Sequence, residues 1–131
     1  MDAIQVAALA LRSLTAILFV GMGLTHFLPR TARGMARIIP PRMRRDGVLN
    51  PLNLVYFTGV CEILGGVGIV LPQTRLAAAV ALTVFLIAVF PANDYASQHP
   101  EKFGRAALPF WPRYLAQLAL ITLVLLAVSL R

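Results

Sequence analysis

Four apolar segments, each long enough to cross a lipid bilayer, constrain this chain more than any other feature. They cover about residues 3–28, 52–71, 76–92 and 114–130. A membrane-crossing helix needs about 17 to 25 mostly apolar residues, and it must satisfy its own backbone because lipid offers no hydrogen-bond partner. Charged residues make up only 13% of the chain, against about 25% in soluble domains. We therefore predict an all-α fold, a single transmembrane four-helix bundle of up-and-down topology over residues 1–131.

The first apolar segment has the length of a signal peptide. It lacks a basic leader and a small-x-small cleavage site, and His26-Phe27-Leu28-Pro29 follows it instead. We expect it to be retained as a helix.

The basic residues predict the orientation of the bundle. In an up-and-down bundle the two long connections, about residues 29–51 and 93–113, lie on one face. Nine basic residues belong to that face and three to the other, which favours long loops in the cytoplasm and both termini outside. The nine are Arg30, Arg33, Arg37, Arg42, Arg44, Arg45, Lys102, Arg105 and Arg113, and the three are Arg12, Arg75 and Arg131.

The net charge of +7 is explained by anionic lipid headgroups, so no nucleic-acid partner is expected. Residues 31–39 mix arginines with apolar residues before Pro40-Pro41, which predicts a short helix in the headgroup layer. The alternative is a basic tether that only sets the topology. A homodimer would cover some of the lipid-facing surface, although nothing in the sequence indicates one.

Glu62 is the first candidate for a functional site, because it lies near the middle of an apolar segment. A carboxylate facing lipid is costly, so Glu62 should face the bundle interior and have a partner there. Small residues around it favour close approach of another helix, and they are Gly59, Gly65, Gly66 and Gly68. Glu62 either binds a ligand or handles protons, or it only locks the helix packing.

Two residues of the first segment are candidate partners of Glu62. Arg12 and His26 share a helix face because they are separated by fourteen residues, two heptads. We expect a long Arg12 side chain to reach inward and pair with Glu62, while His26 either relays protons or is an ordinary interfacial histidine. Asn93 and Gln117 complete the set of candidate ligand-binding or proton-handling residues. The alternative for Asn93 is a polar cap at the end of the third helix, and Gln117 is expected to hydrogen-bond across the bundle.

Aromatic residues gather where the helices meet the long-loop face, which predicts either an interfacial belt or an aromatic-lined vestibule. These residues are Phe27, Tyr56, Phe57, Phe90, Tyr95, Phe110, Trp111 and Tyr114. The single cysteine, Cys61, excludes an internal disulfide, and no metal is expected because Cys61, His26 and His99 match no ligand spacing. No nucleotide-binding loop or nucleophile elbow is present.

Several motifs resemble those of the DoxX-like membrane proteins. They are Gly23-Leu24-Thr25-His26-Phe27-Leu28-Pro29, Ile38-Ile39-Pro40-Pro41, the segment Gly59 to Gly68, Thr74-Arg75 and Phe90-Pro91-Ala92-Asn93. The resemblance implies a four-helix bundle with Glu62 inside and Arg12 early in the first helix. It also implies a link to membrane redox systems with quinone as acceptor, through a membrane or peripheral redox partner.

We carry three functional hypotheses from the sequence. The first is a lipophile-binding accessory subunit, with a quinone or another lipophile held at Glu62 and no catalysis of its own. The second is an assembly or scaffolding factor for another membrane protein, and the third is a small transporter with Glu62 as its proton site. Eleven arginines against one lysine, with abundant alanine, indicate a bacterial inner-membrane protein.

Overall fold

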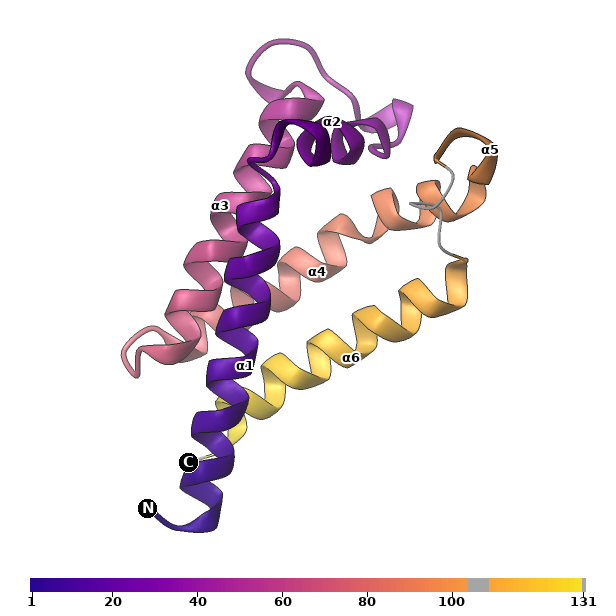
Figure 1. The fold of residues 1–131 in the computed structure, drawn as a ribbon. Helices are drawn as coiled ribbons and strands as arrows, with labels where there is room; N and C mark the ends of the chain where they lie inside the picture. The colour runs from indigo at the N-terminus through magenta and orange to yellow at the C-terminus, as the bar shows by residue number, and fades with distance from the viewer. Residues whose placement is uncertain (104–108, 131) are drawn as a thin grey trace.

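The computed structural model describes residues 1–103 and 109–130. In this part of the chain all the long elements are helices (Figure 1). Arg105 and Arg131, which entered the charge argument, lie outside the described residues. Four helices are long and apolar enough to cross a membrane, as predicted. In chain order the elements are α1 (Ala3–Thr25), α2 (Pro29–Arg37), the 3-10 turns η1 (Pro41–Met43) and η2 (Gly47–Leu49), α3 (Pro51–Val70), α4 (Arg75–Gln98), α5 (Pro100–Phe103) and α6 (Phe110–Ser129).

Local capping explains where the first two long helices begin. The carboxylate of Asp2 accepts a hydrogen bond from the backbone of Gln5, and the Gln5 side chain accepts one from the backbone of Asp2. Asn50 accepts a bond from the Asn53 backbone, and Pro51 occupies the first turn of α3, where its missing N–H is not needed. Both starts therefore satisfy backbone groups that helix termini leave unpaired.

The third long helix extends further than the sequence predicts. Helix α4 continues through Pro91 to Gln98, so Asn93 lies inside it and does not cap its end. A proline inside a helix removes a backbone hydrogen bond and crowds the carbonyl four residues earlier, but the turns that follow Pro91 gain side-chain bonds to Asp94. The Ser97 hydroxyl donates to the Asp94 carbonyl at 2.7 Å, and the Gln98 amide donates to the Asp94 carboxylate at 3.0 Å.

The first long connection contains the predicted short helix, shifted by two residues to Pro29–Arg37. Ala32 of α2 is fully buried, whereas Arg30 and Arg33 are exposed. The guanidinium of Arg44 donates to the carbonyls of Arg37 and Ile39. These bonds give hydrogen-bond partners to backbone carbonyls at the C-terminal end of α2. Helix α2 is therefore amphipathic, with an apolar side on the protein and a basic side facing outward.

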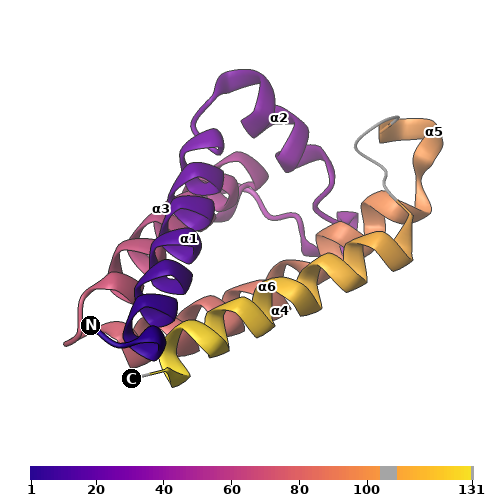
Figure 2. The ribbon, with the colours of Figure 1, turned by 60° about the horizontal axis from the view of Figure 1, so that its bottom comes forward.

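The long helices form two antiparallel pairs, α1 with α3 and α4 with α6 (Figures 1 and 2). The pairs meet near the two chain termini and diverge toward the end that carries α2 and α5 (Figure 1). The buried core lies where the pairs meet, and it consists of Phe19, Ile69, Ala78, Ala79, Leu82, Leu86, Val124 and Ala127. The all-helical prediction is confirmed, but the four helices do not run side by side along their whole length as expected for a closed up-and-down bundle.

Candidate functional site

The close approach of α1 and α3 depends on glycines. A Cβ atom on Gly23 would lie 2.7 Å from the carbonyl oxygen of Gly59, and a Cβ on Gly59 would lie 2.7 Å from the Cβ of His26. A Cβ on Gly66 would lie 3.0 Å from a methyl group of Val20. Any side chain at these positions would push the helices apart, so the glycines allow the two backbones to touch.

The remaining glycines of α3 face α4. A Cβ on Gly65 would lie 2.5 Å from the Leu82 side chain, and one on Gly68 would lie 2.8 Å from the Cβ of Ala78. The four glycines singled out from the sequence are thus all buried within the chain. The helix faces that these glycines form are covered by α1 and α4.

A buried histidine–glutamate pair bridges the contact between α1 and α3. His26 follows the last residue of α1, and its Nε2 lies 2.8 Å from Oε2 of Glu62. The residues are only 8% and 2% exposed. No other residue in the described ranges gives Oε2 a hydrogen-bond partner. Glu62 therefore faces the protein interior, and the imidazole is the group positioned to balance its charge.

The other ring nitrogen of His26 determines where its proton lies. Nδ1 is 3.0 Å from the carbonyl oxygen of Val55 and 3.1 Å from the hydroxyl of Thr58, which itself donates to that carbonyl at 2.8 Å. A carbonyl only accepts, so we assign a proton to Nδ1. Nε2 then either accepts a proton from a neutral Glu62 or donates one to its carboxylate. Both arrangements hold the same number of protons, so the proton can shift between the two side chains without a change in net charge.

The predicted Arg12–Glu62 pair is wrong. Arg12 donates from Nε to the Ala127 carbonyl at 2.9 Å, and a second guanidinium nitrogen donates to the Leu130 carbonyl. Because Gly23 of α1 lies level with Glu62 of α3, Arg12 is eleven residues lower along its helix, or about 16 Å at about 1.5 Å per residue. Arg12 instead donates hydrogen bonds to carbonyls at the C-terminal end of α6, where helix carbonyls have no partner within the helix.

The other predicted polar residues lie apart from the pair. The Asn93 side chain accepts a hydrogen bond at 3.0 Å from Arg113, which joins α4 to the first turns of α6. Gln117 is half-buried and its side chain makes no hydrogen bond to another described residue, so the predicted bond across the bundle is absent there. The structure therefore brings together His26 and Glu62, and leaves Arg12, Asn93 and Gln117 elsewhere.

Aromatic rings at the diverging end form separate clusters within the described part of the chain. Phe27 stacks on Tyr56 with centroids 5.6 Å apart. A second cluster joins α4 to α6 through Phe90, Phe110, Trp111 and Tyr114. A third, around Tyr95, includes His99 and Phe103. Trp111 is 66% exposed, and this arrangement is closer to an interfacial belt than to the lining of one vestibule.

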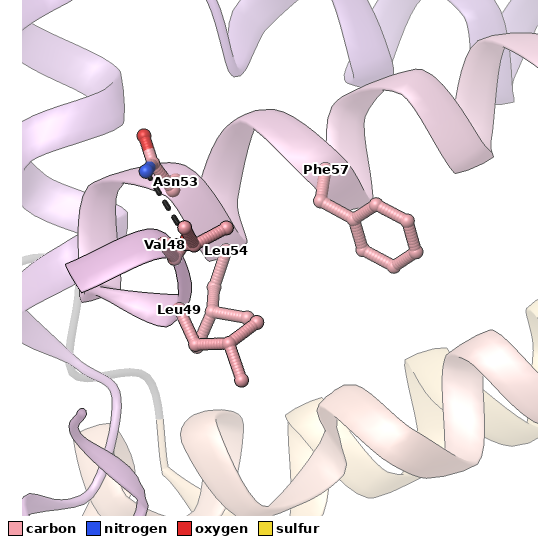
Figure 3. Close-up of a pocket in the computed structure, with 5 residues that line it drawn as sticks. All are labelled: Val48, Leu49, Asn53, Leu54 and Phe57. Carbon is pink, nitrogen blue, oxygen red and sulfur yellow. Dashed lines mark hydrogen bonds between the residues drawn. The ribbon is translucent and has the colours of Figure 1, made fainter. Parts of the chain in front are cut away.

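An apolar pocket of about 350 Å³ opens beside the first turns of α3. It is lined by Val48, Leu49, Asn53, Leu54 and Phe57, and the Asn53 amide donates to the Val48 carbonyl at 3.1 Å, which holds η2 against the helix (Figure 3). Neither His26 nor Glu62 lines this pocket. Sequence reasoning missed it, because it depends on the fold of η2 and not on a motif.

Comparison with known proteins corrects the predicted resemblance. No curated protein and no solved structure matches this chain. A family model matches residues 14–131, and that family is not DoxX. The DoxX-like resemblance is therefore wrong, and the redox partner and quinone that it implied lose their support. The chain belongs to the family described as Domain of unknown function (DUF8561).

Proposed function

We propose that this protein is a membrane subunit that binds a small hydrophobic molecule at the end where its helix pairs diverge. The observation that carries the proposal is the apolar pocket beside α3, whose lining offers four apolar side chains and one amide (Figure 3). Its volume is about 350 Å³, and it is a half-open hollow, since Val48, Leu49 and Phe57 are exposed. Because α3 is long and apolar enough to cross a membrane, a lipophile could reach the pocket from the bilayer.

In this proposal the His26–Glu62 pair is a polar centre inside the α1–α3 contact, one helical turn beyond the pocket. Phe57 lines the pocket and is followed by Thr58, which contacts the imidazole of His26. A ligand that moves Phe57 would therefore act on the residue next to the pair. This connection links the ligand site to Glu62 without requiring Glu62 to touch the ligand.

The proposal also places the protein in the inner membrane of a cell. The long connections, with most of the basic residues, would face the cytoplasm, and both termini would lie outside. Arg33→Cys and Gln5→Cys, each in a Cys61→Ala background, would test this with a thiol reagent that cannot cross membranes. In intact cells Gln5→Cys should react and Arg33→Cys should not, and the opposite pattern would reverse the orientation.

The binding test is mass spectrometry of the protein taken from its own membrane in lipid discs. Leu54→Trp fills the pocket, and Leu64→Trp is the matched control because Leu64 is 66% exposed on the same helix and does not line the pocket. A small lipophile retained by the natural chain and by Leu64→Trp, but lost from Leu54→Trp, would support the proposal. A stoichiometric protein partner with no retained lipophile would overturn it and favour assembly or scaffolding.

A second candidate function is proton handling, and the His26–Glu62 contact favours it. The 2.8 Å separation lets a proton pass between the two side chains, and such a buried pair could change protonation during transport. Glu62→Gln keeps the shape but not the titrating group. Loss of a proton flux in proteoliposomes in Glu62→Gln, with flux retained in Leu54→Trp, would favour this candidate over lipophile binding.

A further inference from the structure

A second, more polar pocket lies between the first long connection and the end of α4. It has a volume of about 240 Å³, smaller than the sites that hold drug-sized ligands. The first long connection contributes Pro40, Pro41 and Arg42 to its lining, and α4 contributes Pro91, Asp94, Tyr95 and Gln98. A pocket of this size suits a small polar group.

Two residues of opposite charge are among those that line this pocket. Arg42 and Asp94 both line it, yet the two side chains form no ion pair with one another. The Gln98 amide donates to one carboxylate oxygen of Asp94 at 3.0 Å, which fixes the carboxylate in place. A guanidinium binds phosphate well, and a carboxylate accepts hydrogen bonds from a primary ammonium group. The pocket thus presents one binding group for each end of a zwitterion.

The position of the pocket limits the source of such a zwitterion. Asp94 lies one turn beyond Pro91 in a helix long enough to cross a membrane, and the aromatic cluster around Tyr95 adjoins it. Aromatic residues of this kind mark the headgroup level of a bilayer. A headgroup carrying phosphate and ammonium is therefore the molecule that this position would meet.

We infer that the pocket between Arg42 and Asp94 binds a phosphate–ammonium zwitterion, as in the headgroup of an ethanolamine phospholipid. Arg42 takes the phosphate and Asp94 takes the ammonium. A purely anionic headgroup lacks the cation and would meet the Asp94 carboxylate. A choline headgroup is cationic but has no N–H to donate. The inference goes beyond the proposed function, because it assigns a lipid class to a different pocket at the same end of the molecule.

The test uses the full chain in discs of equal ethanolamine, glycerol and choline phospholipids, with retained lipids counted by native mass spectrometry. The natural chain should hold the ethanolamine lipid in excess over the disc mixture. Arg42→Gln and Asp94→Asn should each reduce that excess by about tenfold, the scale of one charge-assisted interaction. Arg33→Gln and Asp46→Asn are matched controls, since neither residue lines the pocket, and both should keep the excess.

Absence of ethanolamine selectivity in the natural chain, or equal loss in the controls, would overturn the inference. Competition with soluble phosphoethanolamine then distinguishes a site for the lipid from a site for the free zwitterion. Displacement of the lipid by phosphoethanolamine would support a site for the free zwitterion, and retention would support a site for the lipid. Leu54→Trp should leave the selectivity unchanged, so failure of the proposed function and failure of this inference give different results.

Discussion

Nε2 of His26 lies 2.8 Å from Oε2 of Glu62, across the glycine contact between the two membrane-length helices α1 and α3. The antiparallel register explains the distance, because Gly23 of α1 lies against Glu62 and Gly59 of α3 lies against His26. His26 lies one turn from Gly23 and Glu62 lies one turn from Gly59, so the two side chains meet between these two contacts. Burial makes an unpaired member of the pair costly, so each residue stabilises the native packing of the other.

The first prediction concerns the coupling between these two residues. Glu62→Ala should lower the unfolding free energy by about 1–3 kcal/mol, because it leaves a buried imidazole unpaired. Glu62→Gln should cost less, since its amide can donate to Nε2 while Nδ1 keeps its proton. Steric trapping in lipid bicelles would measure both changes.

A double-mutant cycle with His26→Ala provides the control. The double variant should be more stable than the sum of the single losses predicts, by about 1 kcal/mol or more. Additivity within about 0.5 kcal/mol would contradict a direct interaction between the two side chains.

The second prediction concerns the glycine contact. Gly59→Ala should destabilise the protein by about 1–3 kcal/mol, because the new Cβ would lie 2.7 Å from the Cβ of His26 and the helices would have to separate. Gly21→Ala is the matched control, since a Cβ there meets nothing within 4 Å. Its stability should be unchanged or slightly higher, and equal losses in both variants would show that the cost is not one of packing.

The four long helices could be predicted from the sequence, because continuous apolar segments of this length are typical of membrane-crossing helices. The prediction failed at the end of α4, where Pro91 suggested a boundary. A proline inside a helix loses a backbone bond and crowds the preceding turn, but the bonds of Ser97 and Gln98 to Asp94 stabilise the turns that follow. Such local bonds cannot be read from hydropathy.

The candidate site could be predicted only in part. Burial of Glu62 and closeness of its glycines follow from physical rules, but the partner depended on the register between two antiparallel helices. The sequence favours Arg12, because a second charge explains how the Glu62 carboxylate is tolerated inside the bundle. The contact of Gly23 with Gly59 sets the register that brings His26 to Glu62 instead. A register that places Gly23 against Gly59 predicts the contact between His26 and Glu62.

The third prediction concerns Arg12 as the cap of α6. Arg12→Gln should accelerate hydrogen exchange of the Leu130 amide, which bonds to the Leu126 carbonyl, by roughly tenfold, or about 1.4 kcal/mol. The reason is that the carbonyls of Ala127 and Leu130 lose a charged donor. Arg33→Gln, an exposed arginine of α2, should leave this exchange unchanged. An unchanged rate in Arg12→Gln would mean that the last turn of α6 holds without the guanidinium.

The fourth prediction concerns the link between α4 and α6 at the diverging end. The Asn93 oxygen accepts a hydrogen bond from Arg113 at 3.0 Å. Asn93→Asp should hold or raise the unfolding free energy, because a charged acceptor strengthens a bond to a guanidinium. Asn93→Leu has a similar volume but no acceptor, and it should cost about 1 kcal/mol. Thermal unfolding in detergent micelles would rank the variants, and a less stable Asn93→Asp would show that burial of the carboxylate outweighs its attraction to Arg113.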